Sequence, residues 1–298
     1  MNVIGKKWLF LGASVILVSL SILAIIFYGF RFGIDFTGGT LWQVKFLEKE
    51  VSRDDVVKFF GESLKMDKIS VIPETSTGSF FIRSQEIKEE DHQKISVSLS
   101  KNFGKIDELL FESIGSSIGR ELRNKSITAF ILVLMGISLY IAFAFRKVSK
   151  PISSWKYGVI TLLTLFHDAI IPAGLFAYLG HKLGAEVDTN FIVAILVVMG
   201  FSVHDTIVVF DRIRENLRKS GNKLNDFNGL VNESVNQTFV RSINTSLTLV
   251  LVLFALYFLG SANLQYFVLT MLVGTIVGTY SSIFVASPLL TIWRKRTD

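Results

Sequence analysis

Trp8–Phe30, WLFLGASVILVSLSILAIIFYGF, is a run of 23 residues without a charged side chain. About 20 apolar residues in a helix cross the hydrocarbon core of a bilayer. A secretory signal peptide has an apolar core of only about 7–15 residues and a small-residue cleavage site after it. This run is longer, and no such site follows it. The stretch therefore predicts a permanent transmembrane helix in residues 1–30.

Five further apolar runs of similar length follow. Half of the 298 residues are hydrophobic and 19% are charged, with a mean hydropathy of +0.48, whereas a soluble domain carries about 25% charged residues. The runs are 127–145, 157–179, 191–210, 243–259 and 267–290. The pattern predicts an α-helical polytopic membrane protein with six transmembrane helices, five of them in a bundle over 127–298.

The distribution of Lys and Arg predicts the orientation. Positive residues gather in short cytoplasmic loops. With the N-terminus inside, one basic residue, Lys182, falls in the two short outside loops, against fifteen in the inside segments. These are Lys6, Lys7, Arg146, Lys147, Lys150, Lys156, Arg212, Arg214, Arg218, Lys219, Lys223, Arg241, Arg294, Lys295 and Arg296. We therefore expect both termini in the cytoplasm.

Residues 31–126 differ from the rest, because they are polar, mixed in charge and patterned like a soluble domain. Alternating apolar positions predict strands, and three- or four-residue spacing predicts helices. The expected order is a strand 40–46, a helix 52–64, strands 70–73 and 80–84, a helix 89–102 and a strand 106–113. This β-α-β-β-α-β order predicts an extracytoplasmic α+β domain of the ferredoxin-like type between the first and second spans.

The inside connection 211–242 is too long for a simple turn. Asp211–Lys219 continues the fourth helix, and Gly221 is expected to stop it. An apolar stripe then recurs every three or four residues, at Leu224, Phe227, Val231, Val235 and Phe239. It indicates an amphipathic segment that either lies along the membrane surface or packs on the ends of the bundle.

Two predicted spans contain ionisable residues, and each contains the pair His-Asp: His167–Asp168 and His204–Asp205. A charged group at the bilayer centre costs about 2.5–3.5 kcal/mol on insertion scales, so it faces the bundle or water and has a partner. The pairs predict a proton-handling site. The alternative is a structural network that only ties helices together.

Helical spacing places other polar residues near these pairs. Thr164, Asp168 and Pro172 share one face of the third span, and Arg241, Thr245 and Thr248 share one face of the fifth. Arg241 enters its span from the same side as Asp205 and at a similar depth. We expect Arg241 to be the counter-ion of Asp205 and protonation to break the pair.

The sequence lacks the motifs of several enzyme classes. The sequence contains no GxxxxGK[ST] or HExxH and no Cys, which argues against an ATPase and a zinc protease. The net charge of +6 stems largely from basic residues beside apolar runs rather than from a nucleic-acid face. We expect no enzyme activity, cofactor, metal site or nucleic-acid partner. Gly38–Gly39 is expected to form a tight turn.

Two longer motifs carry a family resemblance. FGIDFTGGT at Phe32–Thr40, with Asp35, Gly38 and Gly39, and GFSVHDTIVVFDRIREN at Gly200–Asn216 resemble the signatures of the SecF family of the bacterial Sec translocase. GRELR at Gly119–Arg123 and NQTFVRSINTS at Asn236–Ser246 add to this resemblance.

The resemblance implies an accessory subunit of protein export, related to the resistance-nodulation-division superfamily, in the bacterial inner membrane. It would pair with a SecD-like subunit beside a SecY-type channel and use the proton-motive force on unfolded exported polypeptides. It maps the family's intramembrane aspartate onto Asp205 and its arginine onto Arg241, with a polar pair at His167–Asp168. Many members have Asn where this chain has His204, so the local proton affinity is expected to differ.

Two other functions fit parts of this pattern. One is half of a proton-coupled solute efflux transporter of the same superfamily, which the small soluble domain argues against. The other is a structural scaffold whose buried charges only hold helices. Replacing the aspartate by asparagine would spare a scaffold and stop either proton-coupled machine.

Overall fold

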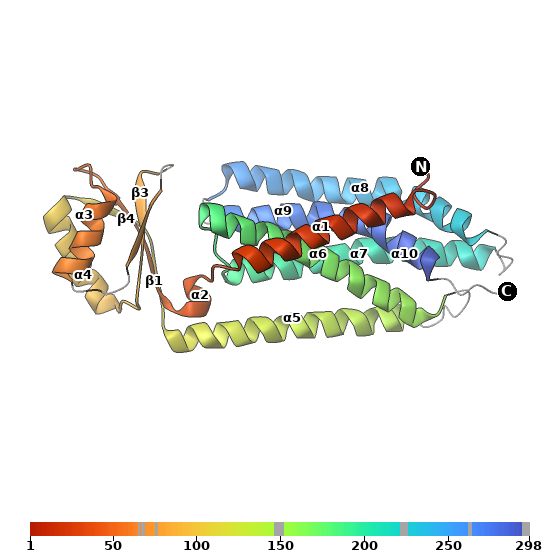
Figure 1. Cartoon of the computed structure of the whole chain (residues 1–298), viewed down its shortest axis with the longest axis horizontal. Helices are drawn as coiled ribbons and strands as arrows, with labels where there is room; N and C mark the ends of the chain where they lie inside the picture. The colour runs from red at the N-terminus through yellow and green to blue at the C-terminus, as the bar shows by residue number, and fades with distance from the viewer. Residues whose placement is uncertain are drawn as a thin grey trace. The chain divides into compact units, whose positions relative to one another are not determined.

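The computed structural model describes residues 1–64, 66, 69–74, 77–145, 152–220, 226–261 and 264–293. The basic residues predicted inside at 146–150, 223 and 294–296, together with Gly221 and Leu224, lie outside this part. The chain divides into two compact units (Figure 1). Met1–Arg31 and Thr128–Asp298 form the helical unit, and Phe32–Ile127 form the α+β unit.

Six helices in the described part are long and apolar enough to cross a membrane. They are α1 (Lys7–Tyr28), α5 (Ser116–Ala144), α6 (Ser154–Leu183), α7 (Thr189–Lys219), α8 (Phe227–Leu259) and α9 (Gln265–Ser281), the last extended by the π-helical η3 (Ser282–Ala286) and α10 (Ser287–Ile292). The predicted six spans are confirmed. Most of these helices extend past the apolar runs because backbone hydrogen bonding continues beyond the hydrocarbon core.

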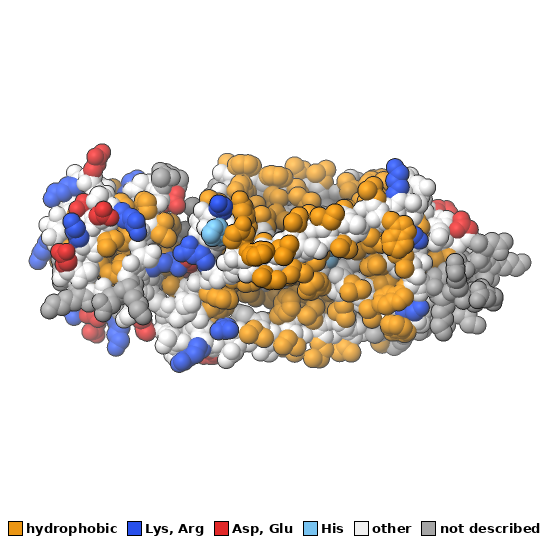
Figure 2. All heavy atoms as spheres, in the orientation of Figure 1, with side chains coloured by type: hydrophobic (Ala, Val, Ile, Leu, Met, Phe, Trp, Pro, Cys, Tyr) orange, Lys and Arg blue, Asp and Glu red, His pale blue; other side chains and the backbone are white. Residues whose placement is uncertain are grey.

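The helices differ in how far they are buried. About half or more of the most apolar window of α6, α7 and α9 is buried, against 6% for α1 and α5. Hydrophobic side chains cover the visible face of the helical unit (Figure 2). The interior of this unit is therefore built from α6, α7 and α9.

Two glycines bring α9 close to α7. A Cβ on Gly274 would overlap the side chain of Val198, and one on Gly278 would lie 3.0 Å from the Cβ of Ser202. This small-residue motif is common where membrane helices approach closely. Here the motif brings α9 against α7 within the helical unit.

The amphipathic stripe of the 211–242 connection is the first half of α8. Phe227, Val231 and Val235 are fully buried, and the Asp226 carboxylate caps the helix by accepting from the Gly229 N–H at 2.9 Å. Asn232, on the same stretch, accepts from the Val3 N–H at 2.8 Å. The stripe therefore packs against protein rather than along the membrane surface, as in the second of the two expected alternatives.

The α+β unit has a four-stranded antiparallel sheet in the order β2-β3-β1-β4. Its elements are α2 (Ile34–Thr37), β1 (Gly39–Phe46), α3 (Arg53–Lys58) with the π-helical η1 (Phe59–Ser63), β2 (Ser70–Glu74), β3 (Ser79–Ser84), α4 (Glu89–Phe103) and β4 (Ile106–Ile114). Trp42, Phe60, Ile82 and Leu99 centre its core. This is the predicted ferredoxin-like order.

The turn between α2 and β1 needs its glycines. Gly38 and Gly39 have φ of +73° and +125°, a region that side chains with a Cβ rarely adopt. A Cβ on Gly38 would lie 2.8 Å from the Ser116 Cα, and one on Gly39 would lie 2.7 Å from the Ser84 carbonyl oxygen. Asp35 lies in the first turn of α2.

Candidate functional site

Asp168 is the centre of a hydrogen-bonded cluster inside the helical unit. Its side chain is fully buried on α6. Its Oδ2 accepts from the hydroxyls of Ser202 on α7 and of Ser281 on α9, the latter at 2.7 Å. Its Oδ1 lies 2.8 Å from Nδ1 of His167. One carboxylate therefore connects three helices.

The second nitrogen of the His167 ring is not hydrogen-bonded. This Nε2 atom is buried and has no hydrogen-bond partner in the described structure. The ring stacks on Tyr280 with centroids 6.3 Å apart. The Tyr280 hydroxyl donates to the Phe10 carbonyl at 2.8 Å, which extends the polar region to α1.

Asp205 on α7 is also buried, at 2% exposure, but has fewer partners. The Ser246 hydroxyl of α8 lies 3.5 Å from its Oδ2, and His204 Nδ1 lies 4.0 Å from its Oδ1. The His204 side chain is 61% exposed. Ser246 in turn lies 2.5 Å from the Thr279 hydroxyl of α9.

Two hydroxyls close in sequence to this cluster are unsatisfied. Those of Thr206, next to Asp205, and of Ser242, one turn before Ser246, are buried without a hydrogen-bond partner in the described part of the chain. Buried polar groups are nearly always paired with protein or water. Spare hydrogen-bonding capacity is therefore present near Asp205 in sequence, whereas both oxygens of Asp168 already have partners.

The expected pair between Asp205 and Arg241 is not formed in this structure. Both residues are described, and no ion pair within 4.0 Å joins them. Arg241 is exposed, and the hydroxyls of Thr245 and Thr248 bond to carbonyls of their own helix. The face of α8 toward Asp205 carries Ser242 and Ser246 instead. One residue corresponds to about 100° of helix rotation, so Arg241 and Thr245 lie on a different side of α8 from Ser242 and Ser246.

Thr164 is fully buried on α6, but its hydroxyl bonds to the Thr161 carbonyl of the same helix at 2.9 Å. Of the predicted face of α6, Asp168 bonds to other helices. The neighbouring His167 ring stacks on Tyr280 of α9. Helical spacing in the sequence does not indicate Ser246, Thr279 or Ser281. Serine and threonine are frequent in membrane helices and often bond to their own backbone, so their presence gave little signal.

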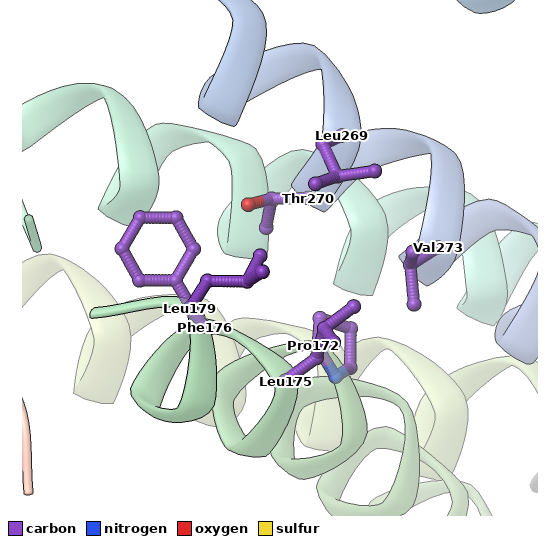
Figure 3. A pocket seen from close by; sticks show the side chains of 7 residues that line it. All are labelled: Pro172, Leu175, Phe176, Leu179, Leu269, Thr270 and Val273. Carbon is purple, nitrogen blue, oxygen red and sulfur yellow. The ribbon is translucent and has the colours of Figure 1, made fainter. Parts of the chain in front are cut away.

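A shallow hollow lies between α6 and α9 at Pro172, lined also by Leu175, Phe176 and Val273 (Figure 3). Its lining contains one polar side chain, Thr270, and no ionisable one. It offers no chemistry related to the aspartates. Within the described ranges no three His, Cys, Asp or Glu residues are grouped as metal ligands.

Two family models match the chain. The SecD/SecF GG motif matches residues 23–46, and the C-terminal model of the protein export membrane proteins SecD/SecF matches residues 94–296. Protein translocase subunit SecF of Thermobaculum terrenum is 42% identical over 99% of this chain and 94% of its own length. SecF of Synechocystis is 36% identical over 89% of this chain and 84% of its own length.

The crystal structure of SecDF from Thermus thermophilus, described as a translocon-associated membrane protein, matches with a TM-score of 0.82 at 33% identity. The match covers 98% of this chain and 38% of the SecDF chain. SecDF in a super-membrane-facing form matches with a TM-score of 0.68 over the same shares.

Proposed function

The chain belongs to the SecD/SecF family of protein export membrane proteins, and from this membership we propose that it drives late steps of polypeptide export with the proton-motive force. It is a multi-pass membrane protein and an accessory translocase subunit rather than an enzyme. Relatives that align with nearly all of the chain carry the SecF name. The solute-efflux alternative has no such support.

A SecD-like subunit is the partner of this chain in the proposal. In SecDF, the matching region is 38% of a longer chain. The exposed face of α8 supports a partner here: Arg241, Asn244 and Thr248 are exposed on an apolar helix. Polar groups in a bilayer face protein or water rather than lipid. A SecY-type channel, unfolded exported polypeptides and the surrounding lipid complete the proposed environment.

Asp205 is the proposed proton carrier, and its incomplete hydrogen bonding is the observation that carries this assignment. It is nearly fully buried, has one hydroxyl at 3.5 Å, and is next to an unpaired hydroxyl in sequence. Such a carboxyl can change partners when it gains or loses a proton. One proton moving through 100 mV releases about 2.3 kcal/mol, enough to bias two arrangements of helices by more than tenfold.

Asp205→Asn tests this function. The variant should insert and bind the partner, and export in membrane vesicles should lose its response to an imposed proton gradient. Asp211→Asn is the control, because Asp211 lies on the same helix but is exposed. Normal gradient-dependent export by Asp205→Asn would sink the proposal and return both aspartates to a structural role. Repeating the assay with a sodium gradient identifies the ion.

A further inference from the structure

The Asp168 and Asp205 clusters share two helices. On α7, Ser202 donates to Asp168, and Asp205 lies three residues further on. On α9, Ser281 donates to Asp168 at 2.7 Å, and Thr279, two residues earlier, contacts Ser246 beside Asp205. Any movement of α7 or α9 relative to Asp168 therefore also moves groups around Asp205.

The helix geometry at this place is unusual. α9 ends at Ser281, and the next five residues, Ser282–Ala286, are π-helical. Single turns of π-helix are rare and occur frequently at functional sites. One turn earlier, Gly278 brings α9 against Ser202 of α7. The close contact between α7 and α9 thus extends to the place where both helices donate to Asp168.

We propose that Asp168 is a positioning residue for Asp205: it holds α7 and α9 on α6 through Ser202 and Ser281 and thereby sets the surroundings of the proton carrier. This inference rests on the function proposed for Asp205. Asp168 is suited to this role because it is fully buried and both of its oxygens have partners. Asp205 exchanges the proton, and Asp168 maintains the geometry.

Removing a single donor is the mildest way to disturb this arrangement. Ser202→Ala and Ser281→Ala each remove one hydroxyl and leave Asp168 in place. They also leave unchanged the nearby titratable and charged groups, which are His167 on α6, His204 on α7 and Arg241 on α8. Thr161→Ala on α6 and Thr270→Ala on α9 are matched controls, because these hydroxyls are buried but bond only to their own helices.

The measurement is the pH dependence of gradient-driven export by the complete translocase in membrane vesicles, with thermal stability recorded for each complex. Both serine variants should move the midpoint of the pH profile by about one unit, the usual size of an environmental effect on a carboxyl. Asp168→Asn should move it in the same direction. Both threonine controls should keep the original midpoint.

The outcomes separate positioning from simple stabilisation. An unchanged midpoint in folded serine variants overturns the proposal, and so does loss of the folded complex in both of them, because either result assigns Asp168 a structural role alone. Failure of the proposed function gives a different result, since Asp205→Asn would then still respond to the gradient.

Discussion

At the scale of single residues, two buried aspartates on neighbouring helices have different surroundings. Asp168 has partners on three helices, whereas Asp205 has one distant hydroxyl. The His next to each also differs, because His167 is buried and His204 is largely exposed. The repeated His-Asp pair in the sequence thus corresponds to two different sites.

Arg241 gives a prediction about the partner. It is exposed and takes part in no described ion pair. Arg241→Ala should therefore change the unfolding free energy of the isolated subunit by less than about 0.5 kcal/mol. Its affinity for a SecD-like subunit should fall by about fivefold or more, as for a residue at an interface centre. Co-purification and titration of labelled partner measure this, with Arg218→Ala as control. Unaltered affinity would place Arg241 outside the interface.

Asp55 gives a prediction about pH. The Ser52 hydroxyl and backbone N–H both donate to its carboxylate, which lowers the pKa of Asp55 below its ordinary value. A lowered pKa in the folded state means that the stabilisation is present at neutral pH and is lost as the pH falls through that pKa.

The protection factors of the amides in the first turn of α3, which correct for the slowing of intrinsic exchange at low pH, should therefore fall on acidification into this range. In Asp55→Asn these protection factors should be lower at neutral pH and respond less to acid. Asp54→Asn, in the same turn but outside the capping box, is the control. Equal acid responses in all three proteins would contradict the assignment.

At the scale of elements, the contact between α7 and α9 depends on Gly274. A larger side chain there would overlap Val198. Gly274→Leu should destabilise the helical unit by about 1–3 kcal/mol through overpacking, measured as a lower thermal midpoint in detergent. A Cβ on Gly136 of α5 would meet no atom within 4 Å, so Gly136→Leu should have little effect. Equal midpoints would show that α9 can move away without cost.

At the scale of the whole molecule, the orientation of the chain can be tested directly because the sequence has no Cys. The excess of Lys and Arg in the inside segments predicts that cysteines replacing Gln85 and Ser261 are labelled from outside intact cells. Cysteines replacing Ser153 and Ser220 should be labelled only after permeabilisation. The reverse pattern would reject cytoplasmic termini.

The sequence alone determined the six spans, the order of the α+β unit and the presence of two aspartates inside predicted spans. These predictions rest on local signals: long uncharged runs, alternating apolar positions, and a carboxyl group inside an apolar run. An apolar run placed in water, or a carboxylate placed in lipid, has a large free-energy cost. The turn at Gly38 and Gly39 could also be predicted from the sequence, because a turn at positive φ restricts the residue type.

Only the tertiary structure decided which side of each helix faces the interior. Arg241 with Thr245 and Ser242 with Ser246 are alternative faces of α8, one residue apart, and only the second meets Asp205. Likewise, nothing local marked Ser281 as a partner of Asp168. The physical reason is that lipid and the interior of a membrane protein are both apolar, so the hydrophobic pattern that orients a soluble helix is weak in these spans.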